Sequence, residues 1–406
     1  MNSYKPGNRI TLLRNGTEYF PALLSAIDRA DREVWLETYI YADDDAGRRV
    51  TAALIRAAGR AVMVRVMVDG WGARHYLTKA IERELTAGGV RLLKYRPEVR
   101  PWHFRSHRLR RLHRKLCHVD GKVAFVGGIN IIDDMNAPGQ KPPRVDFAVR
   151  VEGPLLQFVV QTMQRVWAIN ELVQFGSTPV PLFPPPRRGE RVGAQTAKFV
   201  IRDNLRHRRD IEYSYLAAIR TAKREIIIAN SYFFPGLRFR RAIIAAAERG
   251  VAVTLLLQAR VEFRLLRYAT RALYGQLLQS GIAIQEYHRS FLHAKVAVID
   301  NRWATVGSSN IDPYSLLMAR EANIFVRDPH FADQLRLELL QMIDSGARPI
   351  PPQQWAARPR LFRALNWTAY GILRLAMGIL GYGGNEWFRG RKYPREGGPK
   401  TIAPGR

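Results

Sequence analysis

The sequence predicts an α/β protein in which two copies of one α/β/α sandwich domain pack face to face around a shared cleft. The first observation is a repeated motif, H-x-K, four residues, D, six residues, G-x-x-N, which occupies 113–130 and recurs 180 residues later at 293–310. The second is that helical periodicity alternates with short runs rich in β-branched residues around both copies. One match could be chance, but two with identical internal spacing indicate a duplication.

The expected elements pair off between the halves in chain order. Each unit is a helix followed by a strand. The matching units of the two halves are 19–41 with 211–234, 46–70 with 238–258, and 85–97 with 277–289. Because strands that alternate with helices form layered α/β structures, we expect buried and largely parallel strands. Each half would then contribute one motif to the shared cleft.

Composition shifts divide the chain into four parts. The first domain spans 1–176 and the second 196–350. Residues 177–195 are too rich in proline and glycine for a helix and predict a surface linker. The last part, 351–406, is basic and amphipathic and is expected to associate with a membrane.

The charge balance predicts an anionic partner. The chain has 64 Lys and Arg against 35 Asp and Glu, a net charge of +29, which suits either nucleic acid or an anionic membrane. The single cysteine, Cys117, excludes an intramolecular disulfide and, within the apolar run LCHV, is expected to serve packing. No uncharged apolar run reaches about 18 residues, so no spanning helix is expected.

The motif residues suit phosphoryl transfer without a metal. Histidine can attack when neutral and donate when protonated, so His113 and His293 could act on opposite sides of one phosphorus through a phosphohistidine. On a strand, residues two apart share a face, so Lys115 and Lys295 point where the histidines point and would hold the phosphate oxygens. The motif asparagines, expected to add neutral hydrogen bonds to those oxygens, are Asn130 and Asn310.

Metal chemistry is not expected. The sequence contains no HExxH motif, no cysteine cluster and no dense set of carboxylates, and Asp43–Asp45 resembles a loop. We therefore predict neither a metal nor another cofactor.

The paired motifs resemble the signature of the phospholipase D superfamily, over roughly residues 10–345. More narrowly, the chain is similar to bacterial cardiolipin synthases of the short type, which lack N-terminal transmembrane helices. The segments that carry the narrower likeness are LETYIYADDDAGRR (36–49), RRLHRKLCHVD (110–120), DFAVRVEGP (146–154), IIIANSYFFPG (226–236) and ATVGSSNIDPYSL (304–316).

This resemblance assigns further site residues. It implies that Asp120 and Asp300, the remaining members of the catalytic motifs, hold the turn of each motif. It also implies an acid that orients each catalytic histidine. The matching positions are Glu321, 28 residues after His293, and Asp146, 33 residues after His113.

The resemblance implies transfer of a phosphatidyl group from one phosphatidylglycerol to another, with release of glycerol. The alternatives are another phospholipase D-type transphosphatidylase or hydrolase, a nuclease of the superfamily, and a membrane scaffold with a dead site. Nucleic acid is the less expected partner, because the chain carries both motifs whereas family nucleases are often single-motif chains that dimerise. The preferred acceptor, the identity of the nucleophilic histidine and the oligomeric state stay open.

Two segments predict membrane contact, at the cytoplasmic side of the inner membrane, as a peripheral or monotopic protein. A basic insert within 95–112 includes Arg105, Arg108, Arg110 and Arg111. Residues 361–384 are apolar and aromatic with interspersed arginines, as in a helix that lies in the membrane plane. The alternative for this second segment is a terminal helix that docks on its own domain.

Overall fold

The computed structural model describes residues 3–97, 110–175, 190–203, 207–260, 263–312 and 319–377. Most of the predicted linker and of the C-terminal segment lies outside the described residues. So do Arg105 and Arg108 of the basic insert.

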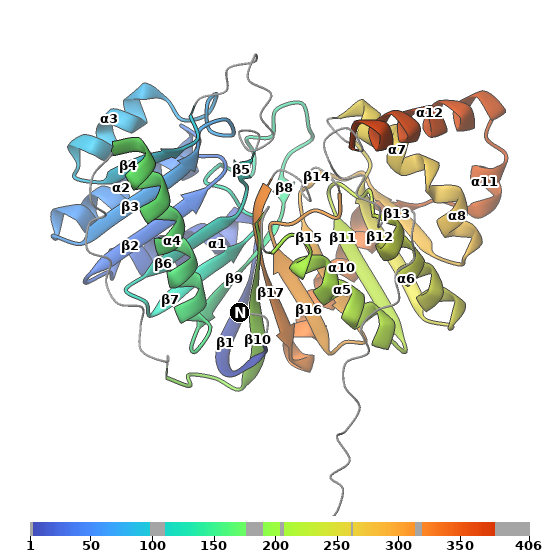
Figure 1. The fold of residues 1–406 in the computed structure, drawn as a ribbon, viewed down its shortest axis with the longest axis horizontal. Helices are drawn as coiled ribbons and strands as arrows, with labels where there is room; N and C mark the ends of the chain where they lie inside the picture. The colour runs from blue at the N-terminus through green and yellow to red at the C-terminus, as the bar shows by residue number, and fades with distance from the viewer. Residues whose placement is uncertain are drawn as a thin grey trace, which may run out of the picture.

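The two halves share one continuous sheet (Figure 1). The first-half strands, in spatial order, are β4 (Arg91–Tyr95), β3 (Met63–Asp69), β2 (Glu33–Thr38), β6 (Lys115–Val119), β7 (Val123–Gly127), β9 (Phe147–Glu152) and β1 (Lys5–Arg14). The second-half strands continue with β10 (Gln195–Arg202), β17 (Ala319–Arg327), β16 (Trp303–Gly307), β15 (Lys295–Ile299), β11 (Glu225–Asn230), β12 (Ala252–Gln258), β13 (Ala283–Tyr287) and β18 (Ala347–Pro349). The antiparallel pair β1–β10 joins the halves, which otherwise repeat each other strand for strand.

Helices cover both faces of this sheet and complete a three-layer α/β/α arrangement, as the sequence predicts. On one face, α4 (Leu156–Phe175) and α10 (Pro329–Gly346) pack on a core that runs through both halves. The helices on the other face are α1 (Asn15–Asp28), α2 (Asp45–Gly59), α3 (Lys79–Ala87), α5 (Asp210–Thr221), α6 (Leu237–Glu248), α7 (Arg264–Ala272) and α8 (Tyr274–Gln279). Near the C-terminus follow α11 (Pro352–Ala356) and α12 (Arg360–Met377).

The expectation of parallel strands is confirmed for the strands that alternate with helices but not for the sheet as a whole. Along the continuous strand order of the described residues, only the helix-linked pairs β2–β3, β3–β4, β11–β12 and β12–β13 are parallel. The motif strands β6 and β7 instead form a hairpin, because Asp120 and Gly121 adopt positive φ angles of 53° and 63° in the turn between them. The sequence pattern of buried runs did not separate these hairpins from helix-linked strands.

Two very short strands tie each half to the other at the edge where the motifs begin. Strand β5 (Arg111–Leu112) pairs in parallel with the start of β17, which belongs to the second half. Strand β14 (Phe291–Leu292) pairs in parallel with β8 (Arg144–Val145) of the first half. Each motif histidine follows directly after one of these strands, so the crossing fixes where its side chain lies.

Candidate active site

The first motif histidine is held by the second half of the protein. The backbone N–H of His113 donates to the carbonyl of Arg320 at 3.1 Å, which extends the β5–β17 pairing by one residue. This places its ring beside the next residue of β17, and His113 Nδ1 lies 2.9 Å from Oε1 of Glu321. Glu321 is fully buried and also accepts a hydrogen bond from the Ser308 hydroxyl.

The second motif histidine is held by the first half in the same way. The N–H of His293 donates to the carbonyl of Val145 at 2.8 Å, and His293 Nδ1 lies 2.6 Å from Oδ2 of Asp146. Both predicted orienting acids therefore contact a motif histidine, and each contacts the histidine of the opposite half. The sequence argument did not assign which acid belongs to which histidine.

The two lysines point to the same side as the histidines, as the strand alternation predicts. Lys115 and Lys295 are the first residues of β6 and β15 and are 3% and 0% exposed. Lys115 Nζ donates to the carbonyl oxygen of His113 at 2.5 Å. Lys295 Nζ contacts the carbonyl oxygen of His293 and lies 3.6 Å from Oδ2 of Asp146. The buried site thus holds two amines beside two carboxylates.

Burial and neighbouring charges set the protonation states. Burial lowers the pKa of His113, and burial together with Lys295 lowers the pKa of His293 to about 3. Burial opposes ionisation of Glu321, but the pKa of its carboxyl is lowered by His113 and Lys115 beside it. Neutral imidazoles next to ionised acids donate their Nδ1 protons to those acids, which leaves the Nε2 lone pairs available for attack.

The amide oxygens of the motif asparagines are held by groups of the same half. Asn130 Oδ1 accepts from the N–H of Ile40 at 3.0 Å, and Asn310 Oδ1 accepts from the hydroxyl of Ser231 at 3.0 Å. Both asparagines are almost fully buried. With the oxygens held in this way, the amide nitrogens are the groups oriented for acceptor ligands such as phosphate oxygens.

The motif aspartates lie at the other ends of the motif strands, away from the histidines. The Asp120 carboxylate accepts three backbone N–H bonds, of 2.9 to 3.0 Å, from residues 31–33. Asp300 accepts three equivalent bonds, of 2.8 to 3.1 Å, from residues 223–225. Burial disfavours the charge of each, but the backbone donors outweigh it and lower the pKa of both carboxyls. This geometry ties each motif hairpin to the start of a neighbouring strand.

Three contributors to the site did not emerge from the sequence. Gly128 makes room for Asp146, since a Cβ at 128 would lie 2.3 Å from Oδ1 of that residue. At the equivalent position of the second motif, Ser308 donates to Glu321. The difference is visible in the aligned motifs, where the first repeat has Gly-Gly at 127–128 and the second has Gly-Ser at 307–308. The Tyr39 ring lies with its centroid 4.8 Å from that of His113 and is also near Lys115 Nζ.

Within the described residues, no group of three or more His, Cys, Asp or Glu side chains is placed to hold a metal ion. Cys117 is fully buried in β6, and burial raises the pKa of its thiol. Its position matches the packing role expected of it.

Comparison with known proteins assigns the family. A model described as cardiolipin synthase, PLD-like domain, matches residues 23–137 and 215–343, which contain the two repeated motifs. The chain belongs to the phospholipase D-like family of cardiolipin synthases. It is 38% identical to cardiolipin synthase B of Escherichia coli K12 over 368 residues, covering 87% of this chain and 86% of that protein. It is 31% identical to a cardiolipin synthase of Geobacillus thermodenitrificans, covering 87% of this chain and 69% of that one.

Solved structures support the fold. The crystal structure of phosphatidylserine synthase from Haemophilus influenzae Rd KW20 superposes with a TM-score of 0.65, covering 91% of this chain and 94% of that one. The two sequences are only 13% identical, so the likeness shows a common fold of two domains and not a common substrate.

Proposed function

We propose that the protein is a cardiolipin synthase that transfers a phosphatidyl group from one phosphatidylglycerol to another through a phosphohistidine intermediate. The observation that carries the proposal is the crossed pair of histidine–carboxylate contacts, His113 with Glu321 and His293 with Asp146. Two oriented imidazoles beside two amines suit an in-line displacement at a phosphodiester. The family membership then supplies the class of substrate.

In the first step, Nε2 of one histidine forms a bond to phosphorus while the bond from phosphorus to the glycerol oxygen breaks. The bound anionic phosphodiester favours the protonated form of the second histidine, which gives its Nε2 proton to the oxygen of the departing glycerol. In the second step, the primary hydroxyl of another phosphatidylglycerol attacks phosphorus, the P–N bond breaks, and the proton returns to the second histidine. Lys115 and Lys295 hold the non-bridging oxygens throughout.

We assign the attack to His113 and the proton transfer to His293. Rapid quench with phosphatidylglycerol radiolabelled in its phosphatidyl group tests the assignment, because the label then stays on the enzyme. His293→Ala should still accumulate covalent label slowly, whereas His113→Ala should accumulate none. The reverse pattern would exchange the two roles.

We further propose that the protein lies on the cytoplasmic surface of the inner membrane without crossing it. Among the described residues, no helix is long and apolar enough to span a bilayer. Helix α12 packs on α7 through Ala369 and Leu373 yet exposes Leu361, Trp367 and Leu375. Figure 1 shows α12 at the upper right of the molecule, and β5, β8 and β14 between the two halves, below the level of α12. Apolar side chains on α12 and a charge of +29 suit an anionic membrane.

The direct test is incubation of the purified protein with phosphatidylglycerol vesicles, followed by lipid mass spectrometry. We expect cardiolipin and glycerol in equal amounts, and no product from the His113→Ala, His293→Ala double variant. Accumulation of phosphatidic acid in place of cardiolipin would instead indicate a hydrolase. Cleavage of DNA or RNA without cardiolipin would favour the nuclease alternative.

A further inference from the structure

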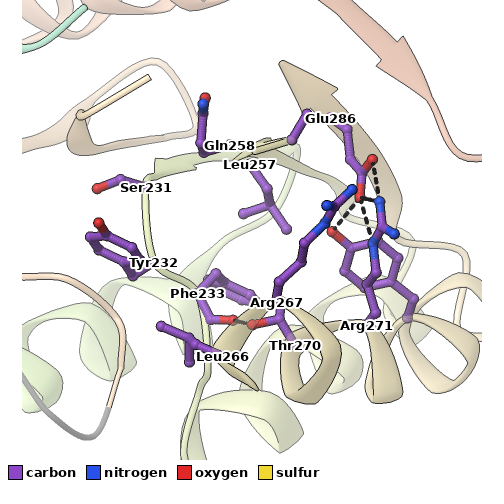
Figure 2. Close-up of a pocket in the computed structure, with 12 residues that line it drawn as sticks. Ser231, Tyr232, Phe233, Leu257, Gln258, Leu266, Arg267, Thr270, Arg271 and Glu286 are labelled. Atoms are coloured by element: carbon purple, nitrogen blue, oxygen red, sulfur yellow. Dashed lines mark hydrogen bonds and ion pairs between the residues drawn. The ribbon is translucent and has the colours of Figure 1, made fainter. Parts of the chain in front are cut away.

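A small pocket opens beside the second motif, and the two-step reaction assigns it no role. It is a narrow hollow that opens to solvent between the ends of β11 and β12 and the inner face of α7 (Figure 2). Its polar lining includes Ser231, Gln258, Arg267, Arg271 and Glu286.

Two of these side chains connect the pocket to the motif histidine. The Ser231 hydroxyl lies 3.4 Å from the carbonyl oxygen of His293 and also donates to Asn310. Oε1 of Gln258 accepts the N–H of Leu292, the residue before His293, at 2.9 Å. A group in the pocket therefore lies next to the backbone that positions His293.

Within the described residues, one of the two arginines that line the pocket is not paired with an acid. Arg271 forms a two-pronged ion pair with Glu286, with Nη2 at 2.9 Å from both carboxylate oxygens, and the Tyr274 hydroxyl donates to the same carboxylate. Arg267 forms no ion pair with an acid in the described structure, and its buried Nε has no hydrogen-bond partner there. Figure 2 shows Arg267 extending along the pocket between Leu257 and Glu286. A partly buried guanidinium with an unused donor is stabilised by a bound anion.

The two halves differ at this flank. In the first half, the N–H of Leu112 donates to Asp69, in the position where Gln258 serves Leu292. Asp69 is fully buried and lies 3.7 Å from Arg111. The first half thus places a carboxyl where the second half places a neutral amide. A carboxyl at this position would repel an anionic ligand beside His113 but not beside His293, and the Glu286 carboxylate of the pocket is paired with Arg271.

We propose that this pocket binds the phosphodiester of the acceptor phospholipid, with Arg267 as its charged contact. The inference rests on the proposed function and assigns the second lipid a place within it. The acceptor differs from the leaving glycerol in carrying its own phosphate. Recognition of that phosphate therefore selects a lipid acceptor over glycerol or water.

Two reactions of the same phosphoenzyme test this proposal. Transfer to a second phosphatidylglycerol gives cardiolipin, whereas transfer to radiolabelled glycerol gives labelled phosphatidylglycerol and needs no second lipid. In Arg267→Gln, the ratio of the cardiolipin rate to the glycerol-exchange rate should fall about tenfold, since a charge-assisted contact is lost. The acceptor concentration for half-maximal cardiolipin formation should rise.

The matched control is Arg264→Gln, an exposed arginine of the same helix that does not line the pocket. It removes the same charge and should leave the ratio unchanged. An unchanged ratio in Arg267→Gln, including an equal fall in both rates, would overturn the acceptor site. So would the same fall in the ratio in Arg264→Gln. Wild-type protein that makes neither product would instead refute the proposed function itself.

Discussion

His113 and Glu321 are 208 residues apart in the chain, yet His113 Nδ1 lies 2.9 Å from Oε1 of Glu321. The contact joins the first motif to a strand of the second half, and His293 with Asp146 repeats it in the opposite direction. Each half therefore supplies the histidine of one pair and the acid of the other. Neither half contains a complete histidine–carboxylate pair, so the duplication has produced one divided site.

The crossed geometry predicts the effect of removing one acid. Glu321→Gln keeps the size of the side chain but loses the charge that fixes the tautomer of His113. The kcat should therefore fall about tenfold to a hundredfold. Steady-state rates on phosphatidylglycerol measure this. Glu248→Gln, at an exposed end of α6, removes the same charge and should leave kcat unchanged. Equal rates for the two variants would mean that Glu321 does not orient the histidine.

The two histidines should act as one unit. His113→Ala and His293→Ala should each abolish turnover, and the double variant should lose no more than either single one, because a complete turnover needs both groups. Lipid product analysis over long incubations gives the rates. A single variant that retained more than about a tenth of the activity would contradict the shared site.

Much of this arrangement follows from the sequence, and the rest depends on contacts that leave little local signal. The repeated helices and strands appear close to the expected positions, since periodicity and buried runs mark them. The crossed pairing depends on β5 and β14, which are two residues long and have no pattern of their own. The motif hairpins carry no signal that separates them from parallel strands, because fully buried strands have the same residue pattern in either direction.

Gly128 offers a test of how tightly Asp146 is placed. A Cβ at this position would lie 2.3 Å from Asp146 Oδ1, so Gly128→Ala should push the carboxylate from His293 and lower kcat at least tenfold. The control is Gly59→Ala, because a Cβ there meets nothing within 4 Å. Thermal unfolding of both variants checks that each is folded at the assay temperature. Full activity in Gly128→Ala would show that the position of Asp146 does not limit the reaction.

The buried lysines predict the pH dependence. Burial lowers the pKa of Lys115 to about 7, so in the free enzyme its ammonium is present below this pH and is lost as the pH rises through it. Since the charged form binds phosphate, kcat/KM should fall above about pH 7. A bound phosphodiester raises the same pKa, so kcat should fall only at higher pH. Rates on monomeric short-chain phosphatidylglycerol separate the two profiles, and superimposable profiles would contradict this role.

Helix α12 predicts how the protein reaches its lipid. Leu361 and Leu375 are 82% and 68% exposed, whereas Leu373 on the opposite face is buried against the domain. Deletion of the whole helix would therefore uncover core as well as remove an anchor. The combined change Leu361→Ser and Leu375→Ser avoids this, and should weaken sedimentation with phosphatidylglycerol vesicles several-fold at an unchanged unfolding temperature.

The control for this surface is Leu337→Ser, which removes an apolar side chain that is 56% exposed on α10. It should leave vesicle binding unchanged, because α10 lies on the other face of the sheet from α7. Binding of all three proteins should decrease as salt rises, since basic residues near an anionic surface contribute attraction that salt screens. If the α12 variant bound vesicles as tightly as the wild type at every salt concentration, charge alone would account for membrane contact. The exposed apolar face of α12 would then have no part in it.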